Sequence, residues 1–143
     1  MKNSLMRTMI AVAALSVAAG TVSAQTLNVR IPMSFRVGEA SMAAGDYQIR
    51  IADGNHGSSL VYVRNTATRA STVTLPVGLG DAPKAWLKDG SPRMSFACAG
   101  EHCTLSSLWN GEGASALRFR NSEHPSVEAR GLTVVTLALV KAR

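Results

Sequence analysis

The clearest pattern in the chain is an alternation of apolar and polar positions that begins shortly after residue 24. Apolar residues occupy every second position from Leu27 to Phe35, with polar residues or proline between them. Successive side chains of a β-strand point to opposite faces, so this pattern predicts a strand with one face in a core and the other in water. Because Pro32 has no backbone N–H, we expect this strand to lie at a sheet edge or to carry a bulge.

Further apolar segments follow, separated by turns rich in Gly, Pro, Asn and Asp. Strands are predicted at residues 47–51, 60–63, 72–77, 116–120 and 132–140. The run at 60–63 predicts burial on both faces, and the strand at 132–140 is apolar on both faces at its centre. Residues 78–83 are predicted to form a loop, and residues 84–88 fit either a short strand or a single helical turn.

Residues 93–110 contain both cysteines and predict a hairpin. Two alternating segments flank residues 99–102, a stretch that includes Gly100 and is suited to a turn. Directly opposed residues of a hairpin share a face. The predicted pairs on one face are Cys98 with Cys103, Phe96 with Leu105, and Met94 with Ser107. Trp109 continues the same alternation and is expected on that face too.

Regularly spaced short strands without a convincing amphipathic helix predict an all-β fold. We expect an antiparallel β-sandwich or a small β-barrel of about eight strands. Residues 25–143 are predicted to form a single domain, a length that suits one hydrophobic core. The pattern does not distinguish a sandwich from a barrel.

The first 24 residues have the three parts of a secretory signal peptide. Lys2 and Arg7 supply a positive start, an apolar run covers residues 9–19, and Val22-Ser23-Ala24 matches an Ala-x-Ala cleavage site. The apolar run is too short to span a bilayer, which needs about 20 residues. We therefore expect cleavage after Ala24, no transmembrane segment in the mature chain, and a periplasmic or secreted location.

An exported protein meets an oxidising compartment, where cysteines pair. The chain has two cysteines, and we expect Cys98 and Cys103 to form a structural disulfide. Zinc binding would need further ligands beyond this pair and His102. A redox role would need a low-pKa environment of the Cys-x-x-Cys kind. We predict no metal site and no cofactor.

The chain carries a moderate positive charge. Without Lys2 and Arg7 the fifteen basic residues become thirteen, against nine acidic ones, a net charge of +4. These charges are scattered, whereas nucleic-acid-binding proteins usually carry a dense basic patch or a recognisable motif. We expect solubilising surface charge and no nucleic-acid partner.

The three histidines, His56, His102 and His124, lie in predicted turns. Catalytic triads are defined by geometry and not by proximity in the sequence, and no G-x-S-x-G nucleophile motif is present. No phosphate-binding loop or calcium loop is present either. We predict a non-catalytic protein. A hydrolase that uses His56 or His124 is the competing hypothesis from the enzyme class.

Two short motifs and the predicted hairpin resemble features of a known group of proteins. Phe35-x-Val37-Gly38, then Ala44-Gly45-x-Tyr47-x-Ile49, and a late apolar hairpin that ends in Trp109 resemble a group of small secreted bacterial proteins of unknown function. Ala43 stands where that group usually has proline, and the cysteine pair is a further departure. The resemblance implies a secreted β-fold and transfers no functional site.

These features predict an exported, non-catalytic β-domain that acts as a structural or protein-binding module of the cell envelope. Its partner would be an envelope protein. The alternative is a lipocalin-like carrier that holds a small apolar ligand inside the sheets. The carrier requires a cavity, which would be lined by the large apolar side chains of Met33, Phe35, Tyr47, Phe96 and Trp109.

Overall fold

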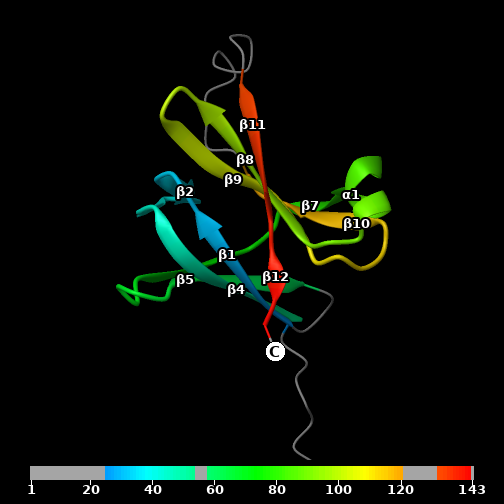
Figure 1. Cartoon of the computed structure of the whole chain (residues 1–143), viewed down its shortest axis with the longest axis horizontal. Helices are drawn as coiled ribbons and strands as arrows, with labels where there is room; N and C mark the ends of the chain where they lie inside the picture. The colour runs from blue at the N-terminus through cyan, green and yellow to red at the C-terminus, as the bar shows by residue number, and fades with distance from the viewer. Residues whose placement is uncertain (1–24, 54–57, 121–131, 143) are drawn as a thin grey trace, which may run out of the picture.

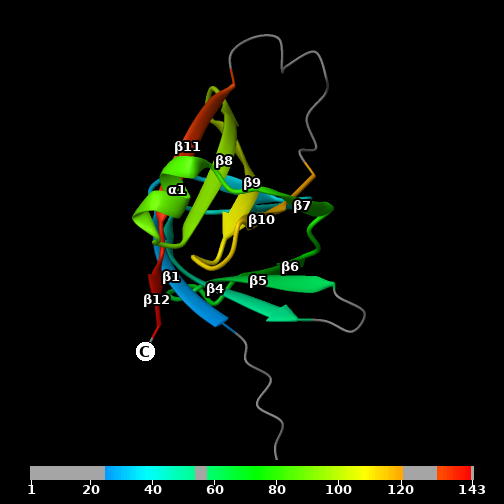
Figure 2. The same cartoon turned by 90° about the vertical axis from the view of Figure 1, so that its right-hand side faces the viewer.

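Two β-sheets make up most of the molecule in the computed structural model, which describes residues 25–53, 58–120 and 132–142 (Figures 1 and 2). The expected signal peptide at residues 1–24 lies outside these ranges, as do His56 and His124. The described residues form twelve strands, more than the roughly eight expected. The sheets do not close into a barrel, so the small-barrel alternative is wrong for the described strands.

The five-stranded sheet has the order β12-β1-β4-β5-β6 and is antiparallel throughout. Its strands are β1 (Gln25–Ile31), β4 (Gly45–Asp53), β5 (Ser59–Asn65), β6 (Ser71–Thr74) and β12 (Val140–Lys141). Its two end strands are β6 and the very short β12.

The seven-stranded sheet has the path β11-β8-β9-β10-β7, with β2 and β3 attached beside β9. Its strands are β2 (Phe35–Val37), β3 (Ala40–Met42), β7 (Gly78–Asp81), β8 (Arg93–Ala99), β9 (His102–Trp109), β10 (Ser115–Arg118) and β11 (Thr133–Ala138). One contact, Arg36 opposite Thr104, is parallel, while the other described pairs are antiparallel.

The two sheets share one hydrophobic core. Its centre is aromatic, with the ring centroids of Phe35 and Tyr47 5.0 Å apart and those of Phe35 and Phe96 5.3 Å apart, both edge to face. The Tyr47 hydroxyl donates a hydrogen bond to the Ala43 carbonyl, which satisfies the one polar atom of that ring. The fully buried members come from both sheets and include Leu27, Ile31, Ile49, Val61, Val63, Met94, Leu105 and Leu108.

The long first strand predicted by the sequence is divided in two at Pro32. Residues up to Ile31 pair with β4 in the five-stranded sheet, and Phe35 begins β2 in the seven-stranded sheet. Apolar alternation continues across the break because both segments face the same core. The edge or bulge expected at Pro32 is therefore a transfer between sheets.

The last segment also serves both sheets. β11 pairs with β8, Leu139 is buried with its N–H bonded to the Pro92 carbonyl, and β12 then pairs with β1. Figure 1 shows this stretch as one red ribbon running from the upper sheet to the lower one. The single strand predicted at 132–140 is therefore two strands, and its apolar centre is exposed or half-buried, with Val134 65% exposed. Edge strands have fewer neighbours to cover them.

The hairpin β8–β9 matches the prediction near its turn. Cys98 lies opposite Cys103 and Phe96 opposite Leu105, and the two cysteines form a disulfide. The turn contains only Gly100 and Glu101, because Ala99 already pairs with His102. Gly100 has a φ of +62°, a conformation that glycine adopts without steric cost. The short closed loop gives a chain-entropy stabilisation of about 2 kcal/mol.

Beyond Phe96 the predicted register is wrong because β9 contains a bulge. Ser107 faces Ser95 and Leu108 faces Met94, which leaves Ser106 as an extra residue. A bulge places two residues of one strand opposite one residue of its neighbour, so the alternation restarts one position later. Leu108 therefore enters the shared core, and Trp109 points to the opposite face of the sheet.

Trp109 forms a second, smaller core on that opposite face. It packs with Ala82, Ala116 and the half-buried Trp86 of α1 (Lys84–Asp89). Its indole N–H donates to the carbonyls of Glu112 and Gly113, at 3.1 and 3.3 Å. The helical alternative for residues 84–88 is thus confirmed.

Two other predictions need correction. Residues 78–83 were expected to form a loop, but Gly78–Asp81 forms β7 and pairs with β10. β5 is buried on one face only, through Val61, Val63 and Asn65, while Leu60 and Tyr62 on the other face are half-buried. No described element covers the outer face of the five-stranded sheet, so a continuous apolar run does not imply burial there.

Candidate functional site

Four exposed apolar side chains follow one another at alternate positions along the β6–β7 segment. Val73, Leu75, Val77 and Leu79 are between 52% and 68% exposed. We call these four residues the apolar strip. They account for most of the exposed large hydrophobic residues in the described part of the chain, and the others, Leu87, Val134 and Val140, are scattered. Exposed apolar residues that are contiguous, and not isolated, mark interaction sites.

The strip is exposed because of the register of β6. Thr72 and Thr74 lie opposite Val63 and Val61, so the threonines face the core side of the sheet. Val73 lies opposite Tyr62 and faces outward. The strand predicted at 72–77 is confirmed only up to Thr74, where β6 ends, and the apolar side of that strand points away from the core.

The strip also lies on two sheet edges. β6 ends the five-stranded sheet and β7 ends the seven-stranded sheet, and the chain passes from one to the other through Leu75-Pro76-Val77. Figure 2 shows this connection on the right-hand side of the molecule, bridging the two sheets. Each edge strand pairs on one side only within the described residues, which leaves backbone groups on its other side available to a further strand.

Two adjoining depressions lie beside the strip. The larger has a volume of about 390 Å³ and is lined by Ser58, Ser59, Leu117 and residues 75–79. The smaller, about 160 Å³, lies between the sheets and shares Ser59, Leu79 and Leu117 with the first. Its wall includes Ile51 and Leu108 of the shared core, with Asp53 and Glu112 among its polar residues. The strip thus borders a concave, partly apolar surface.

Charge is absent from this segment. The sequence contains no acidic or basic residue between Arg69 and Asp81. Soluble proteins usually protect an exposed edge with charged side chains, proline or a covering element. Here Pro76 removes one backbone donor, and Val77 uses its N–H on the Arg118 carbonyl at 2.7 Å. The remaining protection is slight, and this is the signal by which the strip could have been found from sequence.

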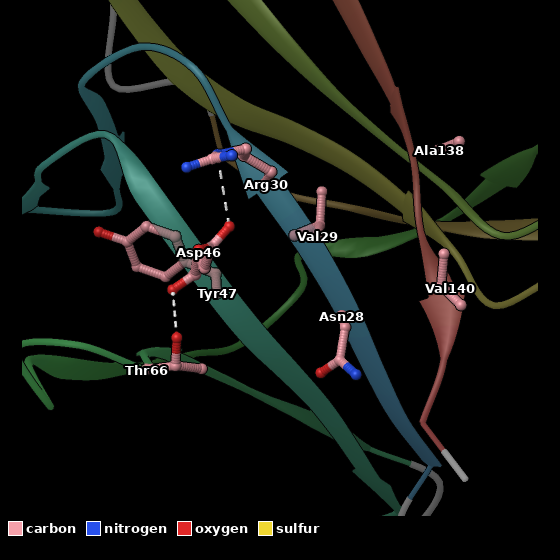
Figure 3. Close-up of a pocket in the computed structure, with 8 residues that line it drawn as sticks. All are labelled: Asn28, Val29, Arg30, Asp46, Tyr47, Thr66, Ala138 and Val140. Carbon is pink, nitrogen blue, oxygen red and sulfur yellow. Dashed lines mark hydrogen bonds and ion pairs between the residues drawn. The ribbon is translucent and has the colours of Figure 1, made fainter.

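A third depression, of about 460 Å³, lies over β1 and β4 near β12 (Figure 3). Its polar groups bind one another. Arg30 Nε lies 3.5 Å from Asp46 Oδ1, and Thr66 Oγ1 donates to the Asp46 carbonyl at 3.2 Å. Both members of the ion pair are largely exposed, and such pairs contribute little to stability. This depression is a shallow polar surface next to Val140.

The residues considered for catalysis and metal binding are distributed as follows. His102 is exposed at the start of β9, beside a depression that also contains Ser34, Ser41 and Glu101. No hydrogen bond joins His102 to either serine in the described ranges. Those ranges also contain no group of three or more His, Cys, Asp or Glu residues placed to hold a metal ion.

Among the residues that the structure describes, one carboxyl group has a clearly shifted pKa. A hydrogen bond from Arg93 lowers the pKa of Asp89 below its usual value, and a hydrogen bond from Ser91 adds to this effect. Asp89 ends α1 and Arg93 begins β8, so the pair links the helix to the sheet. It lies outside the apolar strip.

Comparison with known proteins identifies no relatives. No protein-family model, curated protein or solved structure matches the chain. Within residues 25–53, 58–120 and 132–142, no helix is long and apolar enough to cross a membrane.

Proposed function

We propose that the protein is an exported, non-catalytic β-sandwich module of the cell envelope that binds a partner protein through the apolar strip. The observation that carries this proposal is the run of four exposed apolar side chains along two sheet edges and the connection between them. Interaction sites on soluble domains have this combination of exposed apolar area and available backbone groups.

The mode of binding that fits the strip is addition of a strand. An extended segment of the partner would pair with the free edge of β6 or β7 and place apolar side chains at alternate positions against the strip. Full burial of one Val or Leu side chain contributes about 1.5–3 kcal/mol. Four such residues would offset a substantial part of the ~4–15 kcal/mol that association costs.

Export is supported by two independent features. The first 24 residues have the charge, apolar run and small-residue end of a signal peptide. The disulfide between Cys98 and Cys103 is of a kind that persists in oxidising compartments. Together they support a periplasmic or secreted location.

The carrier hypothesis has less support. Phe35, Tyr47 and Phe96, which were to line a cavity, are almost fully buried, and Phe35 packs edge to face on the other two rings. Trp109 belongs to the second core, on the other side of the seven-stranded sheet. A binding module is therefore the better-supported function.

Site-specific photo-crosslinking tests the proposal. A photoreactive amino acid at position 77, introduced in the native host, should give one discrete adduct with an envelope protein. The same amino acid at Glu39, an exposed residue of the β2–β3 turn, should give none. Adducts of equal yield at both positions, or none at position 77, would contradict the proposal.

A matched pair of lysine substitutions extends this test. We expect Leu79→Lys to lower partner affinity at least about tenfold, a loss of roughly 1.4 kcal/mol. Val134→Lys places the same charge on an equally exposed edge residue of β11 and should change affinity less than about twofold. Both variants should keep the unfolding temperature of the parent, because both side chains are mostly solvated.

A further inference from the structure

The outward face of the five-stranded sheet carries a regular array of polar and cationic side chains. In one row across the sheet, Thr26 lies opposite Arg50, and Arg50 lies opposite Tyr62. In the next row, Asn28 lies opposite Gln48, and Gln48 lies opposite Arg64. We call these six residues the basic face. Directly opposed residues share a face, and neighbouring strands are about 4.8 Å apart, so the six side chains form a compact grid.

Each position of the grid is exposed or half-exposed, and no described element lies over it. The face is solvated because β1, β4 and β5 turn their apolar side chains to the other side, into the shared core. Figure 3 shows Asn28 and Arg30 on this outer surface of β1. The surface is therefore open to a large ligand.

The charges of this face are unbalanced. It carries Arg30, Arg50 and Arg64 against the single carboxylate of Asp46, and Asp46 already pairs with Arg30. In the described residues no carboxylate lies within 4.0 Å of Arg50 or Arg64. Two guanidinium groups on adjacent strands are thus free to bind an anion.

Arg50 is held in position by an aromatic ring. Its guanidinium carbon lies 5.1 Å from the centroid of Tyr62, within the range of a cation–π interaction. This contact restricts the side chain without neutralising its charge. The guanidinium donors stay available for the two oxygens of a carboxylate, which they bind as a fork.

We propose that the basic face binds a carboxylate-bearing polysaccharide. The two arginines supply charge complementarity. Asn28, Gln48 and Thr26 supply neutral hydrogen-bond donors and acceptors, which suit sugar hydroxyls. Two exposed valines lie beside the grid on the same face, Val73 opposite Tyr62 and Val140 opposite Asn28, so the test below includes a lipid surface as a competing ligand. This inference goes beyond the proposed function, because it adds a second ligand on a surface that meets the apolar strip only at Val73, opposite Tyr62.

The test uses the mature chain, residues 25–143, and polygalacturonate as the probe, with affinity measured by calorimetry at low salt. We expect binding that weakens as salt is raised, because fixed charges are involved. Neutral dextran of similar length should not bind. Absence of polygalacturonate binding at low salt would overturn the proposal, and so would tighter binding to phosphatidylglycerol vesicles than to the polysaccharide.

Two double variants show whether binding depends on this particular surface or on the overall positive charge of the protein. Arg50→Gln with Arg64→Gln should lower the affinity at least about tenfold. Arg36→Gln with Lys84→Gln removes the same charge from exposed positions on the other sheet and helix, and should change it less than about twofold. Equal losses in the two double variants would overturn the proposal.

Tyr62→Leu tests the cation–π contact without changing the net charge of the protein. Loss of the ring releases Arg50, so we expect a decrease in affinity of about threefold. An unchanged affinity would overturn the proposed surface, in which Tyr62 positions Arg50. Leu79→Lys should retain polysaccharide binding, so failure of this inference and failure of the strip are distinguishable.

Discussion

Replacement of Phe96 by alanine should lower the free energy of unfolding by about 3–5 kcal/mol, the cost of removing a buried aromatic ring and leaving a cavity. Phe96 is completely buried, lies on β8 between β9 and β11, and packs edge to face on Phe35. Domains of this size are stabilised by only about 5–15 kcal/mol in total. The variant should therefore be marginally folded at best.

Urea unfolding followed by circular dichroism gives the measurement for Phe96→Ala. Val134→Ala is the matched control, because Val134 lies on the adjacent strand β11 but is 65% exposed. It should change the free energy of unfolding by less than about 0.5 kcal/mol. Similar decreases in the free energy of unfolding in the two variants would show that Phe96 does not lie in the shared core.

Trp109→Ala should be the second most destabilising change, with a loss of about 3–5 kcal/mol. The substitution removes the centre of the second core and the indole donor that satisfies two carbonyl groups. Since α1 packs on this core through Trp86, the helix should lose its contact with the sheet.

The chain has only two tryptophans, so Trp86 alone reports on the Trp109→Ala variant. Its fluorescence should shift to longer wavelength as it becomes solvated. Leu87→Ala, on the more exposed side of the same helix, should leave emission and stability nearly unchanged. If Trp109 instead lay in the shared core, its loss would unfold the sheets without first exposing Trp86.

Local patterns predicted much of this fold. Alternation identified the strand at 47–51 and the first half of the strand predicted at 72–77, and the spacing of the cysteines identified the hairpin and its disulfide. These features depend on neighbours in the sequence or on one tight turn. They can therefore be predicted from a single sequence.

Long-range features were harder to predict. The bulge at Ser106 is set by how β9 must meet both β8 and β10, since Phe119 bonds to the Ser106 carbonyl while Ser107 faces Ser95. The transfers between sheets at Pro32 and Leu139 leave the apolar alternation intact, because both sheets face one core. Nothing in the alternation itself marks the change of sheet.

The apolar strip was missed for a different reason. An alternation shows that one side of a strand is apolar, but it does not show which side faces the core. In β6 the threonines face the core side and Val73 faces outward. The absence of charge from 70 to 80 is a weaker signal, and it gains meaning only when the segment is known to lie on two sheet edges.

The most direct test of the account is native mass spectrometry of the protein isolated from the envelope fraction of its host. We predict a chain that begins at Gln25, with the mass of the disulfide form, in complex with a second protein. The complex should be present with the parent chain and absent with Leu79→Lys. A chain that still begins at Met1, or a parent chain with nothing bound, would contradict the account of an exported binding module.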